Sequence, residues 1–410
     1  MAVAATPLRF RAVGDGGRTE RAAIRVQRLL PSGDEAGTAP EDRSFRPDIE
    51  GLRAVAVVFV LLRHSVVSEF PGGFVGVDVF FVISGFVITG LLLRERTATG
   101  RTKVLGFYAR RARRILPMAL FVIVATLIAE RVLFGASVVA PIAQDARWAT
   151  LFLANYPRHV NIFAVGPLPL GVYWSLAVEE QFYVVYPALF IAVCALGHRW
   201  PLRVRLGVFL GVVIAGSFAW SVYSSPSSLF AYQSPFTRAW ELAAGCLLAV
   251  CTRQLVKIPS AVAAAVTWAG LLALVVIGLV LTFPALGYPG WIASLPVTAA
   301  ALIIAGGTAA PRYGAEILLR TAPFKWVGRW SYSIYLWHFP ILILATQHWG
   351  PLSGVENMLL CAGAVALSAA TYYYIENPIR HSKVLVNSPA ASVAMGLLLV
   401  AVCLAVTFVI

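Results

Sequence analysis

The chain consists mainly of long apolar stretches, and short polar segments separate each stretch from the next. A helix needs about 20 predominantly apolar residues to cross a bilayer. Stretches of about that length, of which 236–251 is the shortest, lie at 51–68, 74–93, 115–134, 173–193, 206–223, 236–251, 260–282, 290–307, 330–347, 355–375 and 389–410. The pattern therefore predicts an all-α, polytopic transmembrane helix bundle of about eleven helices.

Composition and charge agree with this prediction. Of the 410 residues, 59% are hydrophobic and only 13% are charged, whereas about 25% charged residues is usual in soluble proteins. The formal net charge of +14 is compatible with nucleic-acid binding. However, the basic residues are gathered in the loops on one side of the predicted bundle. The expected partner is therefore the lipid bilayer and not a nucleic acid.

The basic residues of the loops predict the orientation. Loops at 94–114, 198–205, 252–259, 308–329 and 376–388 hold 19 Lys and Arg, and the loops on the other side hold three. Basic loops face the cytoplasm, so the N-terminus is expected in the cytoplasm and the C-terminus outside. The longest outer loop, about 135–172, is long enough to fold over a site.

Residues 1–45 have mixed charges and scattered Gly, Pro and Ser, so we expect a mostly disordered cytoplasmic tail there. Because this segment lacks a sustained apolar run, we expect no cleavable signal peptide. The sequence also lacks the spacing of a zinc-binding HExxH motif and of a Walker loop. We therefore predict no metal site and no tightly bound cofactor.

Two polar side chains on the first predicted helix, Arg53 and His64, are the leading candidates for chemistry. Their separation of eleven residues, at about 100° per residue, places them on nearly the same face of a helix and about 16 Å apart along it. Charged or titratable groups inside a membrane span usually have a partner or a function. We expect both to line one cavity, although a structural imidazole bonded to a neighbouring helix is an equal alternative for His64.

The second predicted helix carries Asp78, followed by Ser84 and Gly85. Asp78 can orient or charge-balance a histidine, or it can form an ion pair or helix cap near the outer surface. For Ser84 and Gly85 we expect close helix packing through small residues, as we do for Gly72 and Gly76.

Four arginines, Arg110, Arg111, Arg113 and Arg114, precede the third predicted helix. Such clusters are typical topology signals or contacts to anionic lipid. Guanidinium groups also bind phosphate through two hydrogen bonds at once. The cluster is therefore also a candidate site for a phosphorylated cytoplasmic ligand.

The fourth predicted helix begins with Trp174 and continues with Glu179, Glu180 and Tyr183. Glu179 and Tyr183, at i and i+4, face the same way. Aromatic residues here can anchor the helix at the membrane interface or form a sugar-binding face. Further along the chain we expect a local ion pair between Arg238 and Glu241, and a structural hydrogen-bonding role for His338.

Five motifs in this order resemble the acyltransferase 3 family of bacterial integral membrane proteins: Arg53 and His64 with ten residues between them, GGFVGVDVFFVISGF, FYARRARRILP, WSLAVEEQFY and SYSIYLWHFP. The resemblance covers roughly residues 45–380. It implies a ten-helix acyltransferase membrane domain at 46–385, followed by an additional C-terminal helix at 386–410. It also implies a multi-pass protein of the bacterial cytoplasmic membrane.

The resemblance further implies an O-acyltransferase. Such an enzyme moves an acyl group, expected to be acetyl from acetyl-CoA, onto a hydroxyl of a cell-surface glycan, glycolipid or glycosylated natural product. Arg53 and His64 match the family's Arg-x10-His pair, Arg111 and Arg114 its Arg-x-x-Arg, and Glu179 its acid. The register Arg110 and Arg113 fits the same spacing.

On this basis we expect His64, assisted by Glu179 or Asp78, to carry catalysis. Arg53 and the four clustered arginines are expected to bind acyl-CoA as the donor substrate, and Trp174 and Tyr183 to contact the acceptor. An alternative is a proton-coupled transporter or flippase of an anionic or lipid-linked substrate. Another is the unrelated membrane-bound O-acyltransferase type, against which the early Arg-x10-His arrangement argues.

Two features depart from the family pattern. Gly171, Val172 and Tyr173 stand before Trp174, where relatives often have Leu-His-Thr. Many relatives also continue into an extracytoplasmic SGNH hydrolase-like domain. The resemblance therefore leaves three expectations: a membrane domain that works alone, a separate SGNH-type partner protein, or a truncated chain.

Overall fold

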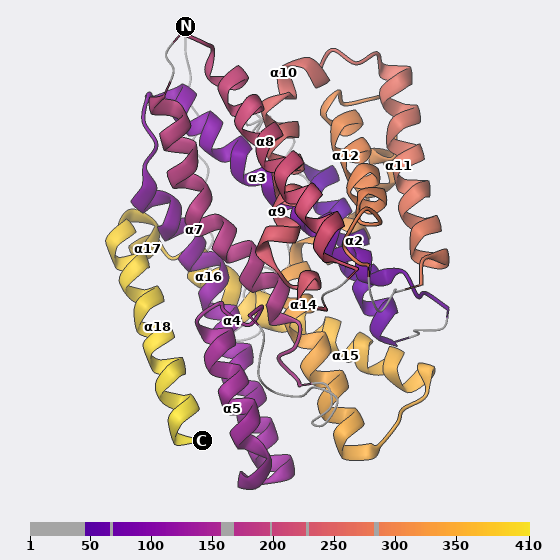
Figure 1. The fold of residues 1–410 in the computed structure, drawn as a ribbon. Helices are drawn as coiled ribbons and strands as arrows, with labels where there is room; N and C mark the ends of the chain where they lie inside the picture. Colours follow the sequence, from indigo (N-terminus) through magenta and orange to yellow (C-terminus); the bar gives the residue numbers. More distant parts are fainter. Residues whose placement is uncertain (1–45, 66–68, 157–167, 197–198, 227–228, 283–286) are drawn as a thin grey trace, which may run out of the picture. The chain divides into compact units, whose positions relative to one another are not determined.

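The computed structural model describes residues 46–65, 69–156, 168–196, 199–226, 229–282 and 287–410 (Figure 1). The predicted tail, residues 1–45, lies outside them. All regular secondary structure in the described residues is helical, so the predicted all-α bundle is confirmed. Among these helices, seven are long and apolar enough to cross a membrane. The chain is thus a multi-pass membrane protein.

A helix lies at each of the eleven predicted segments: α2 (Pro47–Ser65), α3 (Gly76–Thr99), α4 (Val104–Phe134), α7 (Tyr173–Ala195), α8 (Leu202–Ser224), α9 (Pro235–Val250), α11 (Ser260–Val280), α12 (Ser294–Thr308), α14 (Ala322–Trp349), α15 (Gly354–Thr371) and α18 (Pro389–Val409). Short elements connect them: η1 (Gly73–Val75), η2 (Leu229–Tyr232), α10 (Thr252–Leu255), α13 (Glu316–Leu319), the π-helical turn η3 (Tyr372–Glu376), α16 (Asn377–Arg380) and α17 (Lys383–Asn387). The number of membrane crossings and the orientation stay predictions.

Two features of the helices differ most from the sequence prediction. Helix α4 begins at Val104, well before the apolar stretch, because the arginine-rich segment is itself helical. Arginine is a good helix former, but a search for apolar stretches does not detect a helix that is rich in arginine. The segment predicted as an outer loop at 135–172 contains a further helix, α5 (Ala136–Thr150), which packs against α4 and α18.

Helices α3 and α9 cross with their backbones in contact at two glycines. A Cβ atom placed on Gly85 would lie 1.9 Å from the carbonyl oxygen of Leu242. One placed on Gly245 would lie 2.0 Å from the carbonyl oxygen of Val82. Such distances exclude any side chain, so the small-residue packing predicted for Gly85 is confirmed.

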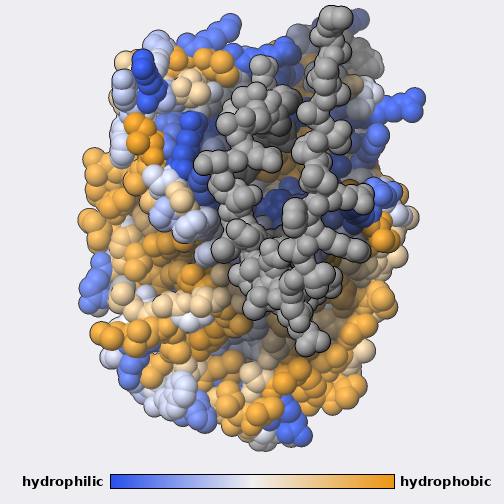
Figure 2. Space-filling model, turned by 180° about the vertical axis from the view of Figure 1, so that it is seen from behind, coloured by the Kyte–Doolittle hydropathy of each residue, from blue (hydrophilic) through white to orange (hydrophobic). Residues whose placement is uncertain are grey.

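Helix α2 packs against both α3 and α14, while the C-terminal helix α18 packs along α4 (Figure 1). Hydrophobic residues cover much of the face drawn in Figure 2, and hydrophilic residues gather mainly toward its upper edge. This distribution suits a protein surrounded by lipid. The arrangement of α2, α3, α4, α7 and α14 is the part of the fold that forms the site.

Candidate active site

Five helices, α2, α3, α4, α7 and α14, enclose a cavity of about 160 Å³. Its apolar wall comes mainly from α3. Its polar and charged lining residues are Glu50, Arg53, Ser84, Arg111, Arg114, Ser175, Glu179, Glu180, Tyr183, Ser331, Tyr332 and Tyr335. Such a concentration of charge between membrane helices marks the cavity as the candidate site.

Three guanidinium groups, those of Arg53, Arg111 and Arg114, line the cavity together with three carboxyl groups. Among the described residues, no ion pair joins any of these arginines to a carboxylate. The Arg111 guanidinium lies instead 4.3 Å from the centre of the Tyr183 ring, in a cation–π contact. These cations therefore keep hydrogen-bonding capacity toward the cavity.

Because the first turns of α4 contain the arginines, the two candidate Arg-x-x-Arg pairs lie on different faces of this helix. Arg111 and Arg114, at i and i+3 on one face, line the cavity. Arg110 forms an ion pair with Glu95 at 3.1 Å. Arg113 donates to the Leu385 carbonyl at 2.8 Å and to Ser392 Oγ at 2.7 Å, which ties α4 to α18. The structure thus brings Arg53 together with Arg111 and Arg114, and directs Arg110 and Arg113 elsewhere.

The carboxylate of Glu179 accepts hydrogen bonds from two hydroxyl groups in the cavity. Ser84 Oγ on α3 is one donor, and the Tyr183 hydroxyl, at 2.5 Å, is the other. The expectation that Ser84 serves helix packing is therefore wrong: its side chain lines the cavity and holds Glu179. Among the described residues, the hydrogen bonds of Glu179 are to these hydroxyls and not to either histidine.

His64 contacts a second histidine, His338 of α14. The distance from His64 Nδ1 to His338 Nε2 is 3.3 Å, and the ring of Phe339 lies against His64 with the centroids 5.2 Å apart. The sequence left open a structural hydrogen bond to a neighbouring helix as the alternative to a chemical role for His64. This hydrogen bond is present. His338 is fully buried and also contacts a backbone carbonyl, as its predicted structural role requires.

The expectation that Arg53 and His64 line one cavity is met only for Arg53, because His64 is not part of the wall. Tyr335 contacts both the cavity and His338. It lines the cavity, its hydroxyl contacts Ser175 Oγ at 2.6 Å, and its ring lies against His338 with the centroids 5.6 Å apart. Tyr335 therefore belongs to the cavity wall and also to the packing around the histidine pair.

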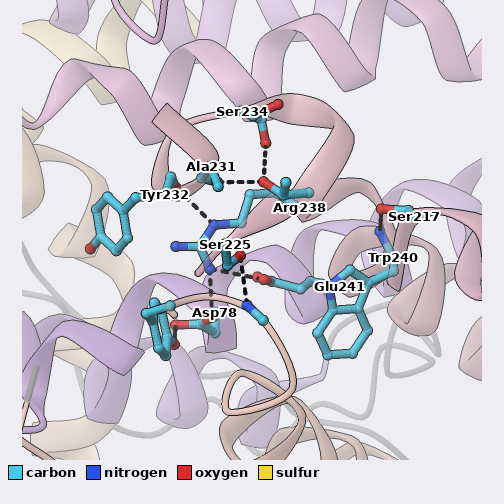
Figure 3. Close-up of polar contacts among 12 residues, drawn as sticks. Asp78, Ser217, Ser225, Ala231, Tyr232, Ser234, Arg238, Trp240 and Glu241 are labelled. Carbon is cyan, nitrogen blue, oxygen red and sulfur yellow. Dashed lines mark hydrogen bonds and ion pairs between the residues drawn. The ribbon is translucent and has the colours of Figure 1, made fainter. Parts of the chain in front are cut away.

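Asp78 belongs to a different polar group, which Figure 3 shows around Arg238. Arg238 Nη1 lies 2.9 Å from Asp78 and 2.9 Å from Glu241, and the Tyr288 hydroxyl donates to Asp78 at 2.7 Å. The predicted ion pair between Arg238 and Glu241 is confirmed. For Asp78 the sequence left open two roles, an ion pair and the orientation of a histidine. The structure shows the ion pair.

The two candidate acceptor contacts lie in different surroundings. Tyr183 belongs to the cavity, through its hydrogen bond to Glu179. Trp174 is buried and packs against the Tyr232 ring, with the centroids 4.8 Å apart. The Arg238 guanidinium lies 5.6 Å from the centre of the Trp174 ring. The structure therefore joins Trp174 to the Arg238 group and not to the cavity wall.

Residues 46–409 match the sequence model of a protein family that is described as an acyltransferase domain. The chain belongs to the acyltransferase 3 family. Its predicted membership is thereby confirmed, and the division into a domain at 46–385 and an additional helix at 386–410 stays a prediction.

Two relatives of this acyltransferase domain are bacterial O-acetyltransferases. The peptidoglycan O-acetyltransferase OatA of Listeria monocytogenes is 30% identical over 368 residues, which are 84% of this chain and 57% of the relative. The O-acetyltransferase OatA of Staphylococcus aureus is 28% identical over 356 residues, which are 82% of this chain and 57% of the relative. The chain thus spans a little over half the length of these relatives. No solved structure matches it.

Sequence reasoning overlooked Glu376, a buried acid of the acyltransferase domain that interacts with arginines of the cavity. Glu376, in the π-helical turn η3, accepts a hydrogen bond from Ser333 Oγ at 2.8 Å. It also interacts electrostatically with Arg53 and Arg114. Turns of this kind often occur at functional sites. The pattern of apolar residues, however, indicates only that Glu376 follows the end of a helix. Among the described residues, no group of three potential metal ligands lies together.

Proposed function

We propose that this acyltransferase domain transfers an acetyl group from cytoplasmic acetyl-CoA to a hydroxyl of a cell-surface glycan. The observation that carries the proposal is the cavity in which Arg53, Arg111 and Arg114 lie without carboxylate ion pairs among the described residues. The proposed location is the cytoplasmic membrane, with the basic loops in the cytoplasm as the loop charges predict.

The arginines of the cavity are suited to the phosphate groups of the donor. Guanidinium groups form paired hydrogen bonds to phosphate oxygens, and cations that lack an ion-pair partner need not break one to do so. The carboxyl groups of the same cavity limit its net positive charge. Glu179 is held by Ser84 and Tyr183, which keeps this carboxylate fixed while the neighbouring arginines engage an anion.

The chemical step is assigned to His64. An uncharged imidazole can remove the proton of the acceptor hydroxyl as that oxygen attacks the thioester carbonyl, and the thiolate of CoA then leaves. Alternatively, the imidazole nitrogen attacks the thioester itself, and the acyl group passes from histidine to the hydroxyl in a second step. Both routes end with the proton on the departing thiol and the acyl group on oxygen.

We infer that the donor passes Tyr335 in either route, because this side chain lines the cavity and its ring lies against His338. The thioester lies at the end of a long flexible arm of CoA, well away from the phosphates. We infer that the phosphates stay near Arg111 and Arg114 while the arm extends past a displaced Tyr335 toward His64.

The acceptor is proposed to be a carbohydrate, and peptidoglycan is the first to test, because one relative is named for it. The rings of Trp174, Tyr232 and Tyr288 pack around the buried guanidinium of the Arg238 group. Its packing and ion pairs are sufficient to explain these residues structurally, so the acceptor assignment rests on the relatives.

The test measures transfer of labelled acetyl from acetyl-CoA to peptidoglycan fragments in membranes that contain the wild type or His64→Ala. We expect the substitution to lower transfer by at least about 100-fold, the lower range for loss of a catalytic base. His348→Ala, which removes an exposed histidine of α14, is the matched control and should leave transfer unchanged.

Unchanged transfer by a properly inserted His64→Ala protein would exclude the proposed catalytic role. Uptake of an unmodified anionic substrate by wild-type vesicles, without acetyl transfer, would instead favour the transporter. Membrane insertion is checked for each variant by its elution as a single folded species in detergent.

A further inference from the structure

The contact between His64 and His338 joins two residues that lie 274 positions apart. His338 is fully buried, with an exposed fraction of 0%, on a helix that packs directly against the helix of His64. The rings of Tyr335 and Phe339 lie against it. The position of the His338 imidazole is therefore set by packing, and so is the direction in which it meets His64.

The partners of His338 determine which of its nitrogens carries hydrogen. Its Nδ1 lies 3.2 Å from the carbonyl oxygen of Ile334, and a carbonyl oxygen can only accept a hydrogen bond. In the uncharged ring Nδ1 must therefore be the donor. The remaining nitrogen, Nε2, then carries a lone pair and can only accept.

The tautomer of His64 follows from that of His338. Because His338 Nε2 accepts, the nitrogen that faces it, His64 Nδ1, must carry the hydrogen. The lone pair of an uncharged His64 then lies on Nε2, the nitrogen remote from His338. A base or nucleophile needs such a lone pair.

We propose that His338 is a positioning residue, which holds His64 in the tautomer whose Nε2 is available to take a proton or an acyl group. The inference rests on the proposed function of His64 and assigns to His338 the orienting role expected of Glu179 or Asp78. Those two carboxylates bond to Ser84, Tyr183, Arg238 and Tyr288. The backbone carbonyl of Ile334, through His338, replaces a carboxylate in this role.

Two amide substitutions at His338 separate positioning from packing. The side-chain oxygen of His338→Gln reaches the place of Nε2 and can still accept from His64. The side chain of His338→Asn is shorter: its amide reaches the place of Nδ1 and can donate to Ile334, but it removes the acceptor that His338 Nε2 presents to His64 Nδ1. Both variants place an uncharged amide in the same buried position, so each is the control for the other.

We expect His338→Asn to lower kcat for acetyl transfer by about 10- to 100-fold, the usual cost of losing a residue that orients a functional histidine. The KM for acetyl-CoA should not change, because His338 does not line the cavity. His338→Gln should keep most of the wild-type kcat. Equal kcat values for the two folded variants, whether both high or both low, would overturn the proposal.

A spectroscopic measurement tests the same inference without activity. In protein labelled with ¹⁵N at its six histidines, the resonances of His64 are assigned by their loss in His64→Ala. We expect a protonated Nδ1 and an unprotonated Nε2 in the wild type, and a shift toward the other tautomer in His338→Asn. A wild-type His64 protonated at Nε2 would contradict the proposal.

The two experiments also separate this inference from the proposed function. If the wild type transfers no acetyl group, the proposed function fails, and the tautomer measurement still decides the role of His338. If the wild type is active and His64→Ala is not, an unaffected His338→Asn overturns only the inference about His338.

Discussion

Arginines within the helix bundle occur in two opposite environments in this molecule. Arg238, whose side chain is 1% exposed, lies 2.9 Å from each of two carboxylates and within 5.6 Å of three aromatic ring centres. Arg53, Arg111 and Arg114 line a cavity, with no ion pair to a carboxylate among the described residues. Arg238 is fully buried and the three cavity arginines are half-buried, so residue type alone does not distinguish a structural cation from one available to a ligand.

The difference lies in what occupies the hydrogen-bond donors of each guanidinium. Taking a charge out of water costs several kcal/mol, and only close partners offset that cost. Around Arg238 those partners are fixed side chains and the carbonyl of Tyr232. In the cavity the partner positions are open to a ligand. Breaking the first environment should therefore unfold the protein, and breaking the second should weaken binding.

The largest effect is expected for Arg238→Met, which leaves Asp78 and Glu241 buried without their shared cation. We expect the free energy of unfolding to fall by about 3–5 kcal/mol, as for other buried pairs that lose one partner. Denaturant unfolding in detergent micelles, followed by tryptophan fluorescence, measures the change. Arg111→Met is the control and should unfold like the wild type. A variant at Arg238 as stable as the wild type would mean that the group is not structural.

A smaller effect, on binding, is expected for Arg111→Met. Loss of a hydrogen bond from a charged group to phosphate costs about 1.5–3 kcal/mol, so the KM for acetyl-CoA should rise by about 10- to 150-fold. Arg110→Met, which removes only the ion pair with Glu95, is the matched control. Steady-state transfer at varied acetyl-CoA gives both values. Equal KM values for the two variants would remove the distinction between cavity and surface arginines.

The smallest effect is expected for Tyr335→Phe. It removes the hydrogen bonds of the hydroxyl to Ser175 and to the Val172 carbonyl, which together contribute about 1 kcal/mol. If Tyr335 must move aside for the donor arm, the rate of a single turnover should rise by up to about fivefold. Rapid mixing with labelled acetyl-CoA measures this rate. A lower rate in the folded variant would show that the hydroxyl takes part in the chemistry.

Much of the fold was predictable because hydrophobic burial in a bilayer leaves a direct pattern in the sequence. The apolar stretches identified the helices, and the rare charged residues within them identified Arg53, Glu179 and Asp78 as noteworthy. The arginine register was not predictable, because an apolar window does not show that α4 begins at Val104. The direction in which Arg111 points depends on the packing of α4 against α18 and α14.

The partners of the candidate residues could not be predicted, since they depend on contacts between distant parts of the chain. Asp78 and Arg238 are 160 residues apart, and Ser84 and Glu179 are 95 apart. A serine next to a glycine looks the same in the sequence whether it packs against a helix or lines a cavity. The pairing of His64 with His338 is likewise invisible without the packing of α2 on α14.

The glycine crossing of α3 and α9 has a consequence for how this domain can move and vary. Because the two backbones touch at Gly85 and Gly245, they should act as one rigid block, and Ser84 next to Gly85 is anchored with them. Its hydroxyl then serves as an immobile reference point for the Glu179 carboxylate. Even one extra methyl group at either glycine would wedge the helices apart, so we expect natural variants to keep both positions bare.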